Sequence, residues 1–259
     1  LGSERALGNG TLATAANTTL DANTAVSVNN AVNLGDNLII GGTSALGLNG
    51  VVSGVAGAGL IKNGTADLIL NGNNTYTGDT QLNAGRLVLG NANALGQGNL
   101  IASAGATLDS NTSLNLGNGI TLNGAVNVGG TGNLTLSGLI SGIGSLVKVG
   151  ASNLTLSGVN TYASTTLLGG VLALTNAGAI GDGDITVGGA STLAGTVPLA
   201  LANNLHLNSV LTLPVGGNAL TLGGVIDGAG SLEKTGSGTL TLNGINTYGG
   251  GTTLSAGTL

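Results

Sequence analysis

The chain has 259 residues, of which 51 are Gly and only 6% are charged, and its net charge is −5 at pH 7. This composition disfavours helices, because each interior Gly costs about 1 kcal/mol relative to Ala and because Thr, Asn, Val and Ile are mediocre helix formers. It also disfavours disorder, since 41% of the residues are hydrophobic and recur at alternating positions with almost no charge between them. The remaining class is all-β.

Short units of the form Leu-x-Leu-x-Gly predict brief strands that each end at a corner. In every unit apolar and polar residues alternate before a Gly that can adopt positive φ. The units, in chain order, are LILNG (68–72), ITLNG (120–124), LTLSG (134–138), LTLSG (154–158), LTLGG (220–224) and LTLNG (240–244).

The absence of some residue types indicates where the protein is located. The chain has no Cys, so neither a disulfide nor a thiolate ligand is available, and together with the absence of Met this suits an extracellular protein. All apolar runs are shorter than the ~20 residues of a transmembrane helix, so we expect no such helix. Because the chain starts at Leu1 without a recognisable signal peptide, we expect it to be a piece of a longer protein.

A long internal repeat organises the chain. Its three Tyr residues, Tyr76, Tyr162 and Tyr248, are separated by 86 residues twice (162−76 and 248−162), and its lysines, Lys62, Lys148 and Lys234, have the same spacing. Looser matches connect residues 5–23, 93–111 and 178–195. We therefore expect a single domain over residues 1–259 that contains long repeats at approximately 1–88, 89–173 and 174–259.

Each long repeat divides into units of roughly twenty residues, which predicts a β-solenoid with about four rungs per repeat, a rung being one full circuit of the chain. Stacked rungs pair their backbones at ~4.8 Å and bury a narrow aliphatic column. Such a thin interior accounts for the rarity of aromatic residues.

The Asn-Thr-Tyr triplets and the lysines form the repeat signature. We expect Asn74, Asn160 and Asn246 to be corner residues, with the Thr that follows each one opening the next strand. The tyrosines are expected to lie flat along the outer face or to cap a corner with a hydrated hydroxyl, the alternative being a ligand-stacking role. The lysines are expected to be exposed and to discourage lateral strand pairing.

Residues 57–89, 142–174 and 228–259 resemble the autotransporter-associated β-strand repeat, also called the passenger-associated transport repeat. The third copy, GAGSLEKTGSGTLTLNGINTYGGGTTLSAGTL, matches the family pattern nearly throughout. The second departs from it at Ala163 and Ser164, and the first lacks one residue before Leu60. The resemblance implies a right-handed, single-stranded parallel β-helix passenger of a Gram-negative bacterium, flanked in the intact protein by a signal and a membrane barrel.

Few residues suggest chemistry. A Ser/His/Asp triad would have to use His206, with Ser209 nearby and Asp227 about one rung later, but no nucleophile-elbow pattern surrounds any Ser, which favours a hydrated surface or corner histidine. Asp182 and Asp184 share a strand face ~7 Å apart and are weak candidates for a cation site or a glycosidase pair. We expect no cofactor, and nucleic-acid binding is disfavoured by five scattered basic residues.

These observations favour a non-catalytic extracellular stalk that supports adhesion, autoaggregation or biofilm contact. Its partners would be surface glycans or proteins, or further copies of itself through faces or end rungs. One alternative is the subunit of a self-assembling filament. Another is the inert scaffold of a passenger whose enzymatic domain lies elsewhere, or a polysaccharide-cleaving β-helix, although the low charge density disfavours the latter.

Overall fold

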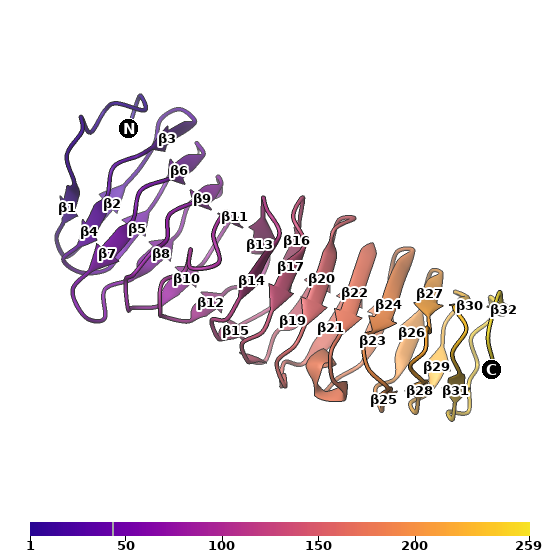
Figure 1. Ribbon diagram of the computed structural model, residues 1–259. Helices are drawn as coiled ribbons and strands as arrows, with labels where there is room; N and C mark the ends of the chain where they lie inside the picture. The colour runs from indigo at the N-terminus through magenta and orange to yellow at the C-terminus, as the bar shows by residue number, and fades with distance from the viewer. Residues whose placement is uncertain (43) are drawn as a thin grey trace.

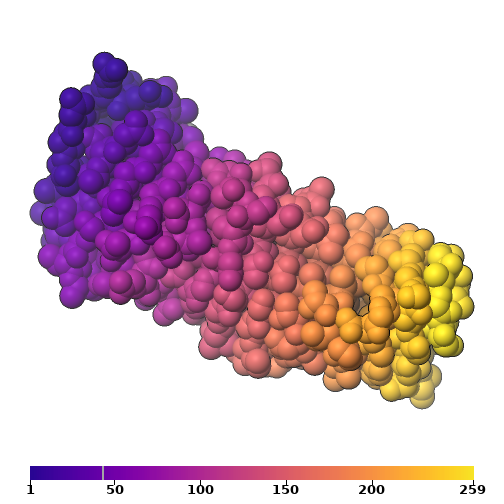
Figure 2. All heavy atoms as spheres, viewed as in Figure 1, coloured from indigo at the N-terminus to yellow at the C-terminus, as the bar shows by residue number. Residues whose placement is uncertain are grey.

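The computed structural model describes residues 1–42 and 44–259. Within that part of the chain there are short parallel strands and one 3₁₀ helix, η1 (Ala177–Ile180), but no α-helix. The strands wind through about twelve rungs, which confirms the predicted β-solenoid. Figure 1 shows the rungs following one another from the N-terminus to the C-terminus, and Figure 2 shows the resulting elongated body.

A regular rung contributes one strand to each of three faces. Face 1 comprises two parallel sheets, ordered β1-β4-β7 and β14-β17-β20-β22-β24-β27-β30-β32. Its strands are β1 (Leu12–Thr14), β4 (Val32–Leu34), β7 (Val52–Gly54), β14 (Leu114–Leu116), β17 (Leu134–Leu136), β20 (Asn153–Leu156), β22 (Gly170–Leu174), β24 (Ser191–Gly195), β27 (Leu211–Pro214), β30 (Leu232–Thr235) and β32 (Thr252–Leu254).

Face 2 also comprises two sheets, whereas face 3 is a single sheet of 11 strands. The strands of face 2 are β2 (Thr18–Leu20), β5 (Leu38–Ile40), β8 (Leu60–Lys62), β10 (Thr80–Leu82), β12 (Leu100–Ala102), β15 (Ile120–Leu122), β18 (Ile140–Ser141), β25 (Leu199–Leu201), β28 (Leu220–Leu222) and β31 (Leu240–Leu242). Those of face 3 are β3 (Val26–Val28), β6 (Leu46–Leu48), β9 (Leu68–Leu70), β11 (Arg86–Leu89), β13 (Thr107–Ser110), β16 (Val126–Gly130), β19 (Ser145–Lys148), β21 (Ser164–Leu167), β23 (Ile185–Val187), β26 (Leu205–Leu207) and β29 (Ile226–Asp227).

The pairing register sets the length of a rung. The number of residues between two paired positions is smallest for Leu154 and Leu172 and is among the largest for Leu38 and Leu60. Most rungs have lengths between these limits. The register places aliphatic side chains on top of one another. Leu134, for example, lies between Leu114 and Leu154.

The core is a narrow column of these inward-facing side chains. Strand residues alternate between buried and partly exposed positions, as expected for side chains that point in and out in turn. Burying one Leu contributes about 1.5–3 kcal/mol, so the column supplies most of the hydrophobic stabilisation. The bulkiest fully buried side chains, however, belong to the repeat signature: Tyr76, Tyr162, Lys62, Lys148 and Lys234.

The long repeat exceeds four whole rungs, so the signature moves round the solenoid. The number of residues left over after four rungs is close to the number that separates the first residues of consecutive strands, such as Leu12 of β1 and Thr18 of β2. Lys62 therefore lies in β8 on face 2, Lys148 in β19 on face 3, and Lys234 in β30 on face 1. Each copy advances by one face, and the lysines do not line up.

Candidate functional site

Each Asn-Thr-Tyr triplet lies where a face lacks a strand. Residues 74–76 follow β7 on face 1, residues 160–162 follow β18 on face 2, and residues 246–248 follow β29 on face 3. The prediction that the Thr opens the next strand is wrong, because β10, the next strand after the first triplet, begins only at Thr80. The triplet therefore replaces a strand.

The Asn side chain restores the pairing that the missing strand would have made. Asn74 Oδ1 accepts a hydrogen bond from the Val52 N–H of the preceding rung at 2.8 Å, and Asn74 Nδ2 donates to the Ala94 carbonyl of the following rung at 2.6 Å. The Thr75 N–H meanwhile donates to the Val52 carbonyl at 2.9 Å. One buried amide thus pairs backbone groups above and below it that would otherwise be unsatisfied.

The second copy repeats this geometry on another face. Asn160 accepts from the Ile140 N–H at 2.8 Å and donates to the Ala179 carbonyl at 2.6 Å. In the third copy, Asn246 accepts from the Ile226 N–H at 2.8 Å. The asparagines are therefore clamps between rungs rather than simple corner residues.

The prediction that the tyrosines lie along the outer face or cap a corner with a hydrated hydroxyl is wrong for Tyr76 and Tyr162. Tyr76 and Tyr162 are 0% exposed, and each hydroxyl is hydrogen-bonded to a buried Thr, at 2.6 Å to Thr80 and 2.9 Å to Thr165. Burial raises the pKa of both phenols, so they stay neutral. No face of either ring is available to stack on a ligand.

The turn after the triplet differs between copies without losing the Tyr–Thr contact. In the second copy Ala163 and Ser164 shorten the turn, and the partner Thr165 lies three residues after its Tyr. In the third copy the hydroxyl of the partly exposed Tyr248 contacts Thr252, four residues later.

A Gly in the following rung makes room for each buried ring. A Cβ on Gly96 would lie 3.2 Å from the ring of Tyr76 and 2.3 Å from its carbonyl oxygen, and a Cβ on Gly181 would lie 3.0 Å from the ring of Tyr162. Both glycines have positive φ, 59° and 82°. Gly96 and Gly181 therefore each form part of a Tyr pocket.

The prediction that the lysines are exposed is also wrong. Lys148 is 1% exposed, and its stem occupies an inward position of β19 while its Nζ reaches the corner. There Nζ donates to the carbonyls of Val149 (2.8 Å), Gly150 (2.9 Å) and Gly169 (3.3 Å). Gly170 leaves room for the ammonium, because a Cβ there would lie 2.9 Å from Nζ.

The other two lysines bond carbonyls in the same places, their own corner and the corner one rung later. These bonds join Lys62 Nζ to Gly64 and to Ala84 (3.2 Å), and Lys234 Nζ to Thr235 (3.0 Å), Gly236 (2.7 Å) and Ala256 (3.0 Å). Burial lowers the pKa of Lys148 to about 8 and also lowers that of Lys62, where Asp67 opposes the shift. The lysines hold rungs together and do not form a shared surface.

A second set of asparagine clamps between rungs was not predicted from the sequence. Three asparagines each donate from Nδ2 to both glycine carbonyls of a Gly-x-Gly turn one rung earlier. They are Asn30 with Gly8 (3.1 Å) and Gly10 (2.6 Å), Asn118 with Gly96 (3.1 Å) and Gly98 (2.6 Å), and Asn203 with Gly181 (3.2 Å) and Gly183 (2.6 Å). Each lies 20 residues after the second Gly (30−10, 118−98, 203−183). This constant spacing is the sequence feature from which these hydrogen bonds could have been predicted.

His206 lies in the middle of β26, with a side chain that is 40% exposed. Its Nδ1 is 2.6 Å from Asp227 Oδ1 and its Nε2 is 3.2 Å from Asp184 Oδ2. Both ring nitrogens therefore face carboxylates, and neither is placed to take a proton from Ser209. The geometry does not support a catalytic triad.

The candidate carboxylate pair is not brought together for a cation. Asp184 directs its carboxylate at His206 and at Asn204 Nδ2, which is 3.1 Å from Oδ1. Asp182 is exposed in the corner before β23. Among residues 1–42 and 44–259, no group of three or more His, Asp or Glu side chains is arranged to hold a metal ion.

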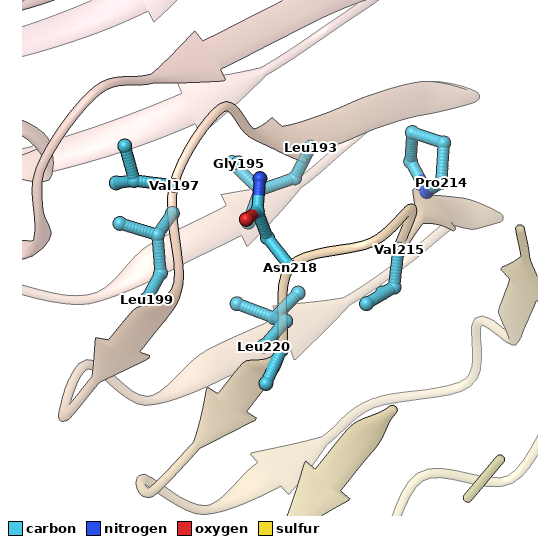
Figure 3. Close-up of a pocket in the computed structure, with 9 residues that line it drawn as sticks. Leu193, Gly195, Val197, Leu199, Pro214, Val215, Asn218 and Leu220 are labelled. Atoms are coloured by element: carbon cyan, nitrogen blue, oxygen red, sulfur yellow. The ribbon is translucent and has the colours of Figure 1, made fainter. Parts of the chain in front are cut away.

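Figure 3 shows a small crevice at the corner between faces 1 and 2, whose lining includes Leu193, Leu199, Val215 and Leu220. Its volume is about 10 Å³, room for roughly one water molecule. Small-molecule sites usually measure about 300–1,000 Å³, so this crevice is no ligand pocket. The larger hollows beside Glu4 and Arg5 are open grooves.

The chain is similar in sequence to a known repeat family and to two autotransporters. The family model described as the passenger-associated-transport-repeat matches residues 60–89, 146–174 and 232–259. The adhesin BmaC autotransporter of Brucella suis biovar 1 (strain 1330) is 39% identical over 50% of this chain and 4% of its own length. The probable autotransporter YfaL of Escherichia coli (strain K12) is 44% identical over 24% of this chain and 5% of its own length.

The chain thus corresponds to a small part of the curated relatives that it matches. No solved structure matches it. In the described part of the chain, no helix has the length and apolar character needed to span a bilayer.

Proposed function

Because this chain is an autotransporter passenger segment with three passenger-associated transport repeats, located at or outside the surface of a Gram-negative bacterium, we propose that it is a non-catalytic stalk. The stalk supports adhesion, autoaggregation or biofilm contact. One observation carries the proposal: a single cluster of buried residues extends from Leu20 to Leu240, and the crevice beside it has a volume of only about 10 Å³. An aliphatic column of this kind supports a rod and leaves no interior site.

The distribution of charge supports a non-catalytic role. A β-helix that cleaves polysaccharide needs a pair of carboxylates free to act on a sugar. Here Asp67 and Asp109 bind Arg86, while Asp184 and Asp227 bind His206. Each of these four carboxylates is therefore paired with a basic side chain.

Exposed amide ladders offer a surface for adhesion. At the corner between face 3 and face 1, Asn49 Nδ2 donates to Asn29 Oδ1 at 2.9 Å, and Asn71 Nδ2 donates to Asn49 Oδ1 at 2.7 Å. Each amide has a second N–H that points away from the ladder bond. Rows of such donors would contact hydroxyl-rich glycans, amide-rich proteins or a second copy, and many weak contacts would add through multivalency.

Beads coated with the purified chain test the proposal. We expect them to cluster and to attach to glycan-coated surfaces, and we expect clustering to fall when Asn29, Asn49 and Asn71 are changed to Asp, because the new carboxylates repel one another and the partner. The Asn63–Asn83 ladder, joined at 2.8 Å, gives a matched control at the corner between faces 2 and 3, with Asp introduced at both of its positions.

Two results would contradict the stalk. The first is the failure of coated beads to cluster or attach while circular dichroism shows an intact β-solenoid. The second is hydrolysis of a polysaccharide, ester or peptide by the purified chain. Electron microscopy of the same material should show short separate rods, whereas long uniform fibres would favour a filament subunit instead.

A further inference from the structure

Two ladders lie along face 3, each with a basic residue between two Asp residues, and they contain all the contacts between basic and acidic side chains within 4.0 Å in residues 1–42 and 44–259. In the first ladder Arg86 reaches both ways along the axis. Its Nη2 is 2.6 Å from Asp67 Oδ2 in the preceding rung, and its Nη1 is 2.9 Å from Asp109 Oδ2 in the following rung. A guanidinium has enough N–H groups to serve both carboxylates at every physiological pH.

The second ladder has the same plan with an imidazole at its centre. His206 on β26 contacts Asp184, next to β23 in the preceding rung, and Asp227 on β29 in the following rung. Asn204 braces the same three rungs, because its Nδ2 donates to Asp184 Oδ1 at 3.1 Å and its Oδ1 accepts from the Val225 N–H at 3.0 Å.

We propose that His206 is a proton-operated clamp across these three rungs, closed when the imidazole is protonated and released on one side when it is neutral. The reason is the donor count. A protonated imidazole has two N–H donors and can bond both carboxylates at once. A neutral imidazole has one, so its other nitrogen presents a lone pair to a carboxylate oxygen, and that contact becomes repulsive.

The charged surroundings favour the closed form. The hydrogen bond that His206 donates to Asp227 raises the pKa of His206 above its usual value, the bond that it donates to Asp184 adds to this, and partial burial opposes it. The charged groups that face the ring from the two neighbouring rungs are these two carboxylates. The residue of β23 that is paired with His206 in the sheet is Thr186, which is uncharged. Because the folded-state pKa is raised, the stabilisation is complete below pH ~6.5 and is lost as the pH rises through the folded pKa.

The two ladders therefore respond differently to pH. The rungs around Arg86 keep both contacts, while the rungs around His206 loosen as the medium becomes alkaline. The effect is local and modest, because the His206 and Asp184 side chains are 40% and 50% exposed. The stalk would thus carry one segment whose stiffness follows external pH.

Because His206 is the only histidine, its imidazole gives one resolved set of signals in an NMR titration of the intact chain. We expect its pKa to be higher than that of a free histidine and to fall in Asp227→Asn. We also expect hydrogen-exchange protection of the Ile185 and Leu205 amides, which bond the Asn204 and Val225 carbonyls, to fall roughly two- to fivefold above the titration midpoint.

Exchanging the central residues provides the matched control. His206→Arg should keep the protection of Ile185 and Leu205 constant with pH, and Arg86→His should transfer the pH dependence to the amides of β11 and β13. The proposal is overturned if His206 titrates like a free histidine, or if the pH dependence of protection persists unchanged in His206→Arg. Because these side chains lie on the outer face, both variants retain the buried column.

Discussion

The regular rungs and the signature rungs of this solenoid are stabilised in different ways. In the rung that contains β14 and β15, the two leucines of β14 stack on Leu134 and Leu136, and Ile120 of β15 stacks on Leu100. A slip of two residues there would again place aliphatic groups on aliphatic groups. In the rung that contains residues 74–76, the amide of Asn74 has unique partners in the rungs above and below it, and the hydroxyl of Tyr76 is bonded to Thr80, four residues later. The comparison indicates that the aliphatic column supplies the bulk of the stability, whereas the signature residues fix the register.

The largest expected loss comes from emptying a Tyr pocket. Tyr162→Ala removes a fully buried ring and should lower the free energy of unfolding by about 3–5 kcal/mol, measured by urea titration. Tyr162→Phe keeps the ring, loses only the contact with Thr165, and should cost about 1 kcal/mol. Equal losses for the two variants would show that the ring volume is unimportant.

Removing an Asn clamp should have the next largest effect. Asn160→Ala leaves the Ile140 N–H and the Ala179 carbonyl without partners and should cost about 2–4 kcal/mol in total. Asn115, exposed on the regular strand β14, is the matched control, and Asn115→Ala should change stability by no more than about 0.5 kcal/mol. Similar values for the two would remove the distinction between signature and regular rungs.

A lysine clamp should contribute less. Lys148→Met keeps most of the stem in the column but leaves the carbonyls of Val149, Gly150 and Gly169 without the ammonium, and we expect a loss of about 1–3 kcal/mol in urea titrations. Leu136→Met, in a buried position of a regular strand, tests the packing change alone and should cost less than about 1.5 kcal/mol. A smaller loss for Lys148→Met than for Leu136→Met would contradict the clamp.

The smallest effect separates backbone strain from contact with the Tyr. Gly105 and Gly181 both have positive φ, 78° and 82°, but a Cβ on Gly105 meets nothing within 4 Å whereas one on Gly181 meets the Tyr162 ring. Gly105→Ala should cost about 1–2 kcal/mol for its backbone alone, and Gly181→Ala about 1 kcal/mol more. A double-mutant cycle with Tyr162→Ala should reduce that excess, while the part due to the Tyr162 carbonyl oxygen, 2.8 Å from the added Cβ, should remain. An unchanged excess would show that the ring contributes nothing to it.

The fold was predictable because its signals are local and repeated. Alternation in units such as LILNG and the 86-residue spacing together specify short stacked strands. The inward orientation of Lys62 could also be predicted, because Leu60 and Lys62 are two residues apart and point to the same side of the strand. Its charge argued against burial, and the carbonyl that helps to bury it, at Ala84, becomes a neighbour only once the register is known.

The side-chain ladders were harder to predict for a related reason. Asp184 precedes His206 by 22 residues and Asp227 follows it by 21, while paired strands elsewhere lie closer in sequence, as Leu154 and Leu172 do. A difference of one residue reverses the face on which a side chain lies. The sequence therefore identifies which residues are one rung apart in general, but not which of them touch.

The advance of the signature by one face in each copy has a mechanical consequence. Three repeats of 86 residues, 3 × 86 = 258, carry the lysine, asparagine and tyrosine clamps once round all three faces. Had the period been a whole number of rungs, every reinforcement would lie along one edge, and the opposite edges would yield first under load. The actual screw-like placement spreads the reinforcement around the shaft, so that no single edge carries all of it.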